Sequence, residues 1–331
     1  MKILVTGGGG FIGAYLVKSL IDKKHNVLSV DKLYGNGAIP FVHPKSKFIR
    51  GDILNKEILE KIKKWKPEII YHLAAQAGGE SAYDDPKKDF LINGHGTYNI
   101  CMIAKELRIK KLIYTSTSAV YGSNTKRIIN EKEKINPDSI YGISKYAGEL
   151  FVNQILKKSS TKTVIFRLFN TYGPGENLNN LKKGMVGIYL SYVWRNKPII
   201  VKGSLDRIRD ITFVEDTVNV LCQTINNKKL KKNETINLSS GKSFTVKKLI
   251  HEIVIGSKKN NIKIIKAKGT PGDSKVFHTD NKKLHKLFPK TTFTSIQAGL
   301  KKYFTWINRV PVKKNLNNYH PFNKFFQKNK I

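Results

Sequence analysis

The stretch Thr6-Gly7-Gly8-Gly9-Gly10-Phe11-Ile12-Gly13 follows the apolar run Lys2–Val5 and opens an amphipathic segment. Its glycines at 7, 10 and 13 recur at every third residue. Where a strand turns into a helix, Gly7 permits the tight turn, Gly10 lets the backbone approach a pyrophosphate, and Gly13 lets helix and strand pack closely. The first helical N–H groups and the positive end of the helix dipole then face the phosphates. The stretch therefore predicts a dinucleotide-binding turn.

Asp31 ends the next apolar run, 18 residues after Gly13. A carboxylate at this position accepts hydrogen bonds from the 2′- and 3′-hydroxyls of a ribose and repels a 2′-phosphate. Asp31 therefore favours NAD over NADP as the cofactor. Lys32 follows directly and weakens this exclusion of NADP.

Apolar runs of strand length alternate with helical patterns through the first 170 residues. We expect strands at 2–6, 26–31, 47–50, 69–73, 111–116 and 163–168, and helices at 11–24, 55–65, 89–107 and 141–158. This alternation predicts an α/β fold with a parallel sheet and helices on both faces. After a loop rich in Gly, Pro and Asn at 171–184 the rhythm changes, with helices expected at 185–194, 216–225 and 245–255 and strands at 199–202, 235–238 and 261–267.

Tyr141 and Lys145 open the helical pattern 141–158 and lie on one helix face. A phenol titrates near 10, too high for a base at neutral pH. We expect the neighbouring ammonium and a positively charged nicotinamide to lower the pKa of Tyr141. The run Thr115-Ser116-Thr117-Ser118 places hydroxyls at the end of the fifth expected strand, the edge at which open α/β sheets bind ligands. Together these groups predict a hydride-transfer site.

Charge is the most conspicuous feature of the composition. The 331 residues include 60 Lys and Arg against 24 Asp and Glu, a net charge of +36, yet only 8 of the 60 are Arg. The lysines are scattered along the chain, whereas nucleic-acid surfaces more often interleave Arg with aromatic residues. We therefore expect a solvated surface that favours small anionic ligands, with nucleic acid disfavoured as a partner.

Other classes of protein are excluded by simpler counts. No apolar run approaches the roughly 18 residues of a membrane span, so no membrane association is expected. Cys101 and Cys222 form no CxxC motif and supply no metal site, and we interpret both as buried thiols of a protein from the reducing cytoplasm.

The order and spacing of these motifs resemble the extended short-chain dehydrogenase/reductases, and within them the NAD-dependent nucleotide-sugar epimerase/dehydratase family of the UDP-glucose 4-epimerase type. The resemblance extends from Met1 to about Trp306. The matching segments are TGGGGFIG (6–13), Asp31, GDI (51–53), HLAA (72–75), Asn93 with GT (96–97), TSTSAVYG (115–122), YGISK (141–145), RLFNTYGPG (167–175), RD (209–210) and PGD (271–273).

The resemblance implies a Rossmann-type, doubly wound parallel sheet with a smaller C-terminal lobe that closes over a nucleoside-diphosphate sugar. On this basis residues 1–170, with 212–240 returning to them, bind NAD; residues 171–211 and 241–310 bind the sugar nucleotide; residues 311–331 form a loosely ordered basic tail. The resemblance also implies a homodimer that pairs through the expected helices 89–107 and 141–158.

The site residues follow from the motifs and the resemblance together. Those assigned to the cofactor are Gly7, Gly10, Phe11, Ile12, Gly13, Asp31, Asp52, Ile53, Leu73, Ala74, Ala75, Asn93, Tyr141 and Lys145. Those assigned to the substrate are Thr117, Asn170, Arg209 and Asp273, and those assigned to catalysis are Thr117, Tyr141 and Lys145.

Two departures from the family pattern narrow the activity. Related dehydratases carry Asp-Glu directly after the residue that matches Thr117, whereas this chain has Ser118-Ala119 and so lacks their proton shuttle. Thr117 with Tyr141 suffices for oxidation and re-reduction at one carbon, which favours epimerisation, most simply at C4 of a UDP-hexose. The second departure is Thr270, where many relatives have an arginine; Lys268 or Lys275 could replace that diphosphate contact.

Two alternatives remain open at this stage. One is a nucleotide-sugar reductase or dehydrogenase that uses NAD or NADP and releases it in each cycle. The other is a non-catalytic relative of the fold that binds RNA through its lysines, although the intact Asp31, Tyr141 and Lys145 argue against it.

Overall fold

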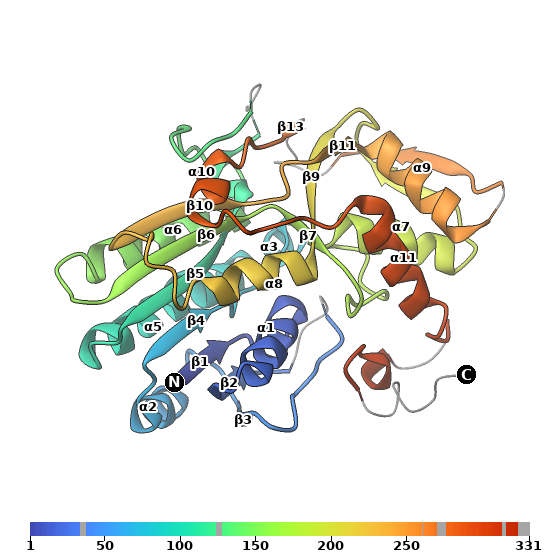
Figure 1. Ribbon diagram of the computed structural model, residues 1–331. Coiled ribbons are helices and arrows are strands. Elements are labelled where there is room, and N and C mark those ends of the chain that lie inside the picture. Colours follow the sequence, from blue (N-terminus) through green and yellow to red (C-terminus); the bar gives the residue numbers. More distant parts are fainter. Residues whose placement is uncertain (34–37, 124–127, 260, 270–275, 313–315, 324–331) are drawn as a thin grey trace.

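A sheet of seven parallel strands forms the centre of the protein (Figure 1). The structure, a computed structural model, describes residues 1–33, 38–123, 128–259, 261–269, 276–312 and 316–323. The strands of this sheet are β1 (Lys2–Thr6), β2 (Asn26–Asp31), β3 (Lys47–Arg50), β4 (Ile69–His72), β5 (Lys111–Thr117), β6 (Lys162–Leu168) and β10 (Asn233–Leu238).

The order of the strands creates a crevice at one edge of the sheet. They lie in the order β10-β6-β5-β4-β1-β2-β3, so the chain runs outward from β1 to β3 and then crosses back to β4 on the other side of β1. At such a reversal the loops that follow the two central strands diverge, and ligands bind between them. The expected α/β fold with a doubly wound parallel sheet is confirmed.

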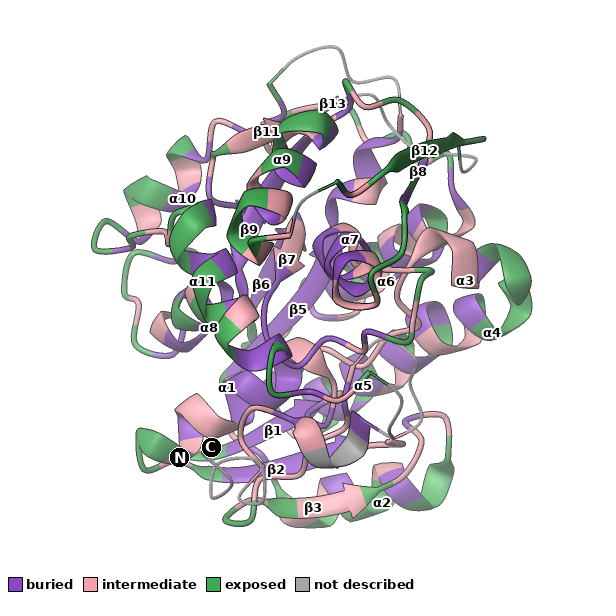
Figure 2. Cartoon of the chain, turned by 90° about the vertical axis from the view of Figure 1, so that its right-hand side faces the viewer, coloured by how far each residue is buried: buried purple, intermediate pink, exposed green. Residues whose placement is uncertain are grey.

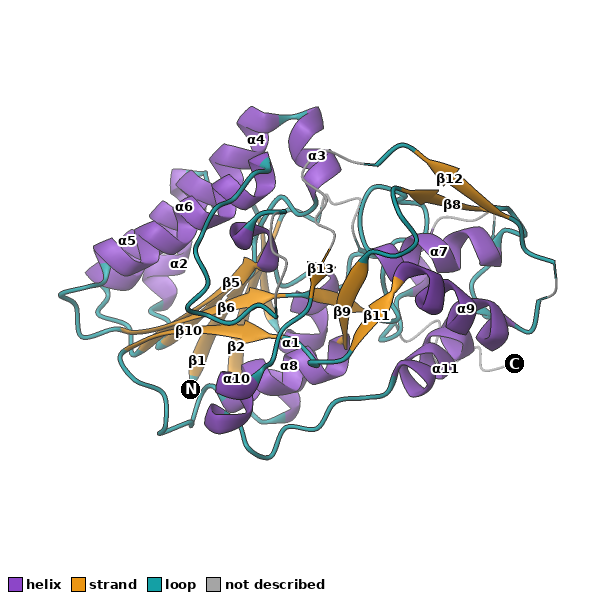
Figure 3. Cartoon of the chain, turned by 90° about the horizontal axis from the view of Figure 1, so that it is seen from above, coloured by secondary structure: helices purple, strands orange, loops and turns teal. Residues whose placement is uncertain are grey.

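Helices cover both faces of the sheet, as Figure 3 shows. On one face α1 (Phe11–Asp22) and α8 (Val214–Gln223) bury Leu16, Leu20 and Leu221 in a core shared with the strands. On the other face α2 (Lys56–Trp65), α5 (Gly96–Glu106) and α6 (Ile140–Ile155) form a second core. Burial on both faces explains why the strands are continuous apolar runs rather than alternating ones.

The helix expected at 89–107 is divided into three parts. After the short helix α3 (Gly79–Asp84), α4 (Pro86–Phe90) leads into a π-helical turn (Leu91–His95), and α5 follows. Two glycines, Gly94 and Gly96, weaken regular helix here. The buried Asn93 side chain lies 3.2 Å from Asp89 and 3.0 Å from Ser144, and these hydrogen bonds stabilise the wider turn. Such turns are frequent at functional sites.

The remaining elements form a smaller group beside the carboxyl end of the sheet (Figure 1). Its central strand, β9 (Ile208–Phe213), pairs with β7 (Asn170–Tyr172), β11 (Ser243–Thr245) and β13 (Val276–Phe277), and β8 (Ile199–Lys202) pairs with β12 (Ile264–Ala267). The helices α7 (Met185–Trp194), α9 (Val246–Ser257) and α11 (Ile296–Ile307) enclose the core of this group. Figure 2 shows their buried inner sides.

The segment after residue 311 differs from the expected loosely ordered tail. Leu316–Tyr319 form a turn of 3-10 helix in which Leu316 is buried, and His320 has no exposed surface. The Trp306 indole N–H donates a hydrogen bond of 2.8 Å to the carbonyl of Tyr319. This part of the segment is ordered because the apolar and aromatic residues that recur among its lysines pack against the rest of the chain.

Besides α3, the helices α10 (Lys282–Leu287) and α11 near the C-terminal end lie outside the expected pattern. The helix α10 contributes Leu284 to the core under the sheet, although its residues fall in the stretch expected to form the substrate lobe. The helix α11 was not expected, although Leu300, Tyr303 and Trp306 recur at helical spacing. In the part of the chain that the structure describes, every helix is too short or too polar to cross a membrane.

Candidate functional site

The glycine turn links β1 to α1 and leaves its backbone open on one side. Gly7 has a φ of +73°, and a Cβ there would lie 2.6 Å from the backbone nitrogen of Ala74. A Cβ on Gly13 would lie 2.0 Å from the carbonyl oxygen of Gly7, so both positions require glycine. A Cβ on Gly10 would meet no protein atom other than that carbonyl oxygen, at 3.3 Å. This space and the unpaired N–H groups of α1 form a cradle suited to a pyrophosphate.

The Asp31 carboxylate is fixed beside the turn. Its two oxygens accept hydrogen bonds from the backbone N–H groups of Gly9, at 3.0 Å, and Leu33, at 2.7 Å. Lys32 forms an ion pair with Asp52. The charge of Lys32 is therefore balanced by Asp52, and the Asp31 carboxylate is left to distinguish a ribose 2′-hydroxyl from a 2′-phosphate. This arrangement suits NAD rather than NADP.

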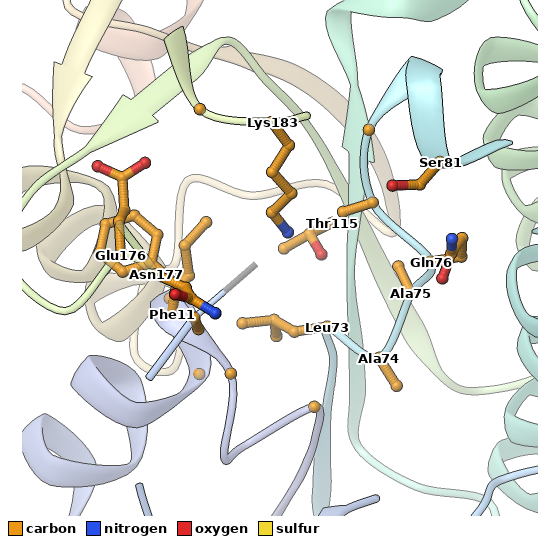
Figure 4. A pocket seen from close by; sticks show the side chains of 18 of the residues that line it. Phe11, Leu73, Ala74, Ala75, Gln76, Ser81, Thr115, Glu176, Asn177 and Lys183 are labelled. Carbon is orange, nitrogen blue, oxygen red and sulfur yellow. The ribbon is translucent and has the colours of Figure 1, made fainter. Parts of the chain in front are cut away.

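A cavity of about 1100 Å³ extends from the glycine turn to the loop after β6. Figure 4 shows side chains converging on it from the first sheet and from the second group of elements. The residues that line it include the expected cofactor and substrate residues Gly7, Gly10, Phe11, Ile12, Gly13, Asp31, Asp52, Ile53, Leu73, Ala74, Ala75, Thr117, Tyr141, Lys145 and Asn170. The volume and the polar groups at both ends suit a dinucleotide with a second ligand.

Thr117 and Tyr141 meet on the wall of this cavity. Thr117 ends β5, and Tyr141 lies in the first turn of α6, which begins after the cap formed by the Ser139 hydroxyl and the Gly142 N–H at 3.1 Å. Burial raises the pKa of Tyr141 to about 12 and the charge of Asp89 adds to this effect, whereas the nearby Thr117 hydroxyl lowers it.

Lys145 lies one turn further along α6 but points to a different partner. Its ammonium group lies 4.3 Å from the centroid of the Tyr114 ring. Burial lowers the pKa of Lys145 to about 7, and Glu149 and Asp89 oppose that shift. Burial of the phenol therefore sets the direction of the Tyr141 pKa shift, and Lys145 is not among the groups that lower this pKa.

Asn93 supports the cavity from behind. Its amide oxygen accepts from the backbone N–H of Gln76 at 2.9 Å, and its amide nitrogen donates to the carbonyl of Gln76 at 3.0 Å. Asn93 has no exposed surface, whereas Gln76 lines the cavity. Asn93, which the resemblance assigned to the cofactor, therefore lies outside the cavity lining and positions the Gln76 backbone.

The expected diphosphate residues are only partly brought together. Asn170 lines the cavity and donates a hydrogen bond of 3.2 Å to the carbonyl of Asp210. Arg209 is buried on β9 outside the cavity lining, and its guanidinium donates to the carbonyl of Ile208 at 2.8 Å. Burial and the neighbouring Arg207 lower the pKa of Arg209 to about 9. Asp273, Thr270 and Lys275 lie outside the described residues.

Two charged residues of the cavity were missed by the sequence reasoning. Lys183 packs its stem on Gly78, whose φ is +104°, and extends into the cavity (Figure 4). Burial lowers the pKa of Lys183, and Glu176 opposes this. Burial raises the pKa of Glu176 to about 7, although its carboxylate accepts hydrogen bonds from the Gly173 N–H and the Tyr303 hydroxyl. Both residues come from the aperiodic loop 171–184, and only the LKKG run signalled a cation there.

A metal centre finds no support in the described residues, where no three His, Cys, Asp or Glu side chains are grouped to hold an ion. The arrangement instead combines a phosphate cradle, a ribose-binding carboxylate and a hydroxyl pair. These are the groups needed to hold a nicotinamide dinucleotide and to move a proton at a carbon–oxygen centre.

Comparison with known proteins agrees with this chemistry. Residues 3–239 match the model of the NAD dependent epimerase/dehydratase family. A Methanocaldococcus jannaschii protein provisionally named as a UDP-glucose 4-epimerase is 31% identical over 310 residues, which cover 92% of this chain and 98% of that protein.

Solved structures give the same result. The UDP-glucose 4-epimerase of Thermotoga maritima, solved with UDP-glucose, superposes with a TM-score of 0.87 at 27% identity, covering 93% of this chain and 99% of that one. The UDP-glucuronic acid 4-epimerase of Bacillus cereus, in complex with UDP-glucuronic acid and NAD, has a TM-score of 0.86 at 26% identity and covers 94% and 100%. The chain therefore belongs to the NAD-dependent epimerase/dehydratase family, and its cofactor is NAD.

Proposed function

We propose that this enzyme inverts the configuration at C4 of a UDP-hexose through a transient 4-keto sugar. The observation that carries the proposal is the placement of the Thr117 hydroxyl beside the Tyr141 phenol on the cavity wall. The names of the relatives support the same activity, since all three are named for epimerisation at C4 of a UDP-sugar.

The chain's own part in the reaction is proton transfer at one hydroxyl. Tyr141 takes the proton of the C4 hydroxyl as the carbonyl forms and returns it as the carbonyl is reduced, and Thr117 orients that hydroxyl. NAD, when bound, supplies the acceptor and later the donor of the C4 hydride. Lys145 reaches the same cavity, and we assign it to the nicotinamide ribose and to stabilising the phenolate.

Elimination of water, the reaction of the dehydratases in this family, lacks its acid and base here. Ser118 and Ala119 follow Thr117 and form a 3-10 turn. The acidic residues that line the cavity are Asp31, Asp52 and Glu176, and none of them belongs to the stretch 115–119. Without a carboxylate beside Thr117, the 4-keto sugar can be reduced again but has no group to remove its C5 proton.

The binding roles are divided between the two groups of elements. We assign NAD to residues 1–170 with 212–240, which β10 supports by pairing with β6 in the central sheet. We assign the sugar nucleotide to 171–211 and 241–310, except for α10, which packs under that sheet. For the diphosphate we propose Asn170 and Lys183, which line the cavity, ahead of Arg209.

The helices α4, α5 and α6 present an apolar surface that suits a second copy of the chain. Phe90, Tyr98, Met102, Ile143 and Leu150 are each at least 40% exposed there. The pairs at positions 98 and 102 and at 143 and 150 repeat at helical spacing, as in a helix-to-helix interface. We propose a homodimer through this surface, which predicts that Tyr98→Glu converts a dimer into a monomer in light scattering.

Two features support a cytoplasmic enzyme that provides sugar nucleotides for polysaccharide synthesis. Cys101 and Cys222 are both buried and free of disulfides, as is usual in a reducing compartment. The sugar nucleotides held by the solved neighbours are activated donors of the kind that such synthesis consumes.

The test is incubation of the purified protein with UDP-, GDP-, CDP- and dTDP-sugars, with products identified by NMR. We expect a UDP-hexose and its C4 epimer to interconvert without added NAD. Stoichiometric release of NADH together with a 4-keto product would replace this proposal by a net dehydrogenase. A steep salt-dependent affinity for RNA without turnover would favour the non-catalytic alternative.

A further inference from the structure

Residues 38–41, which precede β3, lie against the cavity. Ala38, Ile39 and Pro40 line the cavity directly. On one side the N–H of Phe41 donates to the carbonyl of Gly9 in the glycine turn, at 3.1 Å. On the other side the N–H of Ile39 donates to the carbonyl of Gly175, at 3.0 Å. Residues 38–41, here called the bridge, therefore join the glycine turn to the loop that carries Gly175.

The C-terminal end of the described chain covers the bridge from outside. The His320 imidazole is stacked on the Phe41 ring, with centroids 4.5 Å apart and an interplanar angle of 10°. The Phe322 ring is edge-on to Phe41 at 5.7 Å and to Tyr15 of α1 at 4.6 Å. Leu316 lines the cavity beside them. In Figure 1 this red segment lies beside the blue chain that links β2 to β3.

Hydrogen bonds fix the segments on both sides of these aromatic contacts. The indole of Trp306 on α11 holds the carbonyl of Tyr319 at 2.8 Å, and the Tyr15 hydroxyl holds the carbonyl of Pro174 at 2.9 Å. His320 is fully buried, and its Nδ1 accepts from the Phe322 N–H at 3.2 Å. A Cβ on Gly175 would lie 3.4 Å from the His320 Nε2. His320 is thus enclosed between the bridge and the residue to which the bridge is bonded.

We propose that residues 316–323 act as a strap that holds the bridge closed and so retains NAD in the cavity from one turnover to the next. The proposal rests on the proposed epimerisation, since a hydride taken from C4 must return to the same sugar. An enzyme that lost its reduced cofactor in mid-cycle would release a 4-keto sugar and become inactive. A reductase has the opposite need, because its cofactor leaves in every cycle.

The size of the effect follows from the aromatic contacts. A pair of packed aromatic rings stabilises a folded structure by a modest free energy. His320 and Phe322 together make three such ring contacts with Phe41 and Tyr15. We therefore expect their joint removal to accelerate NAD dissociation by roughly ten- to a hundredfold. Tyr141, Thr117 and Asp31 are untouched, so proton transfer at a bound sugar is preserved.

The experiment compares His320→Ala, Phe322→Ala and the double variant with His320→Phe, which keeps a stacked ring. Phe293→Ala is the matched control, because Phe293 makes an edge-on contact of 6.0 Å with His285, away from the cavity. NAD bound after purification is quantified by extraction, and its dissociation rate is measured by trapping released NAD with a soluble dehydrogenase. Circular dichroism verifies that each variant is folded.

We expect the double alanine variant to lose NAD at least tenfold faster than the wild type, each single alanine variant to lie between these two, and His320→Phe and Phe293→Ala to stay within about threefold of the wild type. Folded alanine variants that retain NAD as long as the wild type would overturn the strap. The two proposals can fail separately. If the alanine variants lose NAD faster but the wild type epimerises no sugar, the strap is supported and the proposed function is refuted. If the wild type epimerises a UDP-hexose but the alanine variants retain NAD normally, the proposed function is supported and the strap is refuted.

Discussion

The hydroxyl of Thr117 lies beside the phenol of Tyr141, although the two residues come from a strand and a helix that are separated by more than 20 residues. The carboxyl end of β5 and the first turn of α6 meet at the cavity, so one sugar hydroxyl can contact both oxygens. The structure thus provides a two-oxygen proton site in which the two residues directly after Thr117, Ser118 and Ala119, carry no carboxylate.

Tyr141→Phe deletes one oxygen and keeps the ring. We expect turnover to fall by about 10²–10⁴-fold, because a positioned acid and base contributes that much. NAD should remain bound, since the glycine turn and Lys145 are unchanged. Tyr146→Phe, on the same helix and outside the cavity lining, is the control and should retain wild-type turnover. Equal loss in both variants would remove Tyr141 from the mechanism.

Asp31→Ala should weaken NAD binding more than NADP binding. The carboxylate bonds ribose hydroxyls that NADP presents only in part, and a hydrogen bond to a charged group is worth about 1.5–3 kcal/mol, or roughly tenfold and more in Kd. The substitution also removes the hydrogen bonds that the Asp31 carboxylate accepts from the Gly9 and Leu33 N–H groups, and this loss should weaken the binding of NAD and NADP equally. The Kd values are measured by titration, with the exposed Asp22→Ala as control. A wild type that prefers NADP would contradict the cofactor assignment.

Lys183→Met removes a cation from the cavity and keeps most of the stem that packs on Gly78. If the ammonium holds the substrate diphosphate, the KM for the UDP-sugar should rise about tenfold or more while NAD occupancy is unchanged. The neighbouring Lys182→Met removes an exposed charge paired with Asp84 and should have little effect. An equal rise in KM for both variants would point to general electrostatics, and a large effect of Arg209→Ala alone would restore Arg209 as the main diphosphate contact.

Glu176 makes the stability of the protein depend on pH. Its pKa is raised from 4.5 to about 7, so its protonated form is favoured by folding. That contribution is complete below about pH 4.5 and is lost as the pH rises through about 7. Relative to Glu176→Gln, the wild type should lose up to about 3 kcal/mol of unfolding free energy between pH 4.5 and 8. Urea denaturation at both pH values tests this, with the exposed Glu60→Gln as control; parallel curves for wild type and Glu176→Gln would contradict it.

The parts of the fold that the sequence predicted share a local cause. Each of the seven strands of the central sheet was expected within about two residues of its observed ends, because strands buried on both faces are unbroken apolar runs. The glycine turn, Asp31, Thr117 and Tyr141 were found because their chemistry depends on spacing along the chain. They line one cavity because parallel strands end at one edge.

What the sequence did not predict depends on contacts between distant segments. Lys183 and Glu176 acquire their surroundings from Gly78 and Tyr303, and the loop that carries them has no periodic pattern. The strands β7, β11 and β13 are two or three residues long, too short for alternation to be visible. The rise in the pKa of Tyr141 on burial was not foreseen, because spacing revealed the neighbouring lysine but not the depth of burial.

The transient 4-keto mechanism is tested most directly by the fate of the hydrogen at C4. A UDP-hexose deuterated at C4 is converted in ordinary water, and the product is analysed by NMR and mass spectrometry. The account predicts that deuterium remains at C4 of the epimer, because Tyr141 and Thr117 exchange only the hydroxyl proton with solvent. Product that carries hydrogen from water at C4 would contradict it.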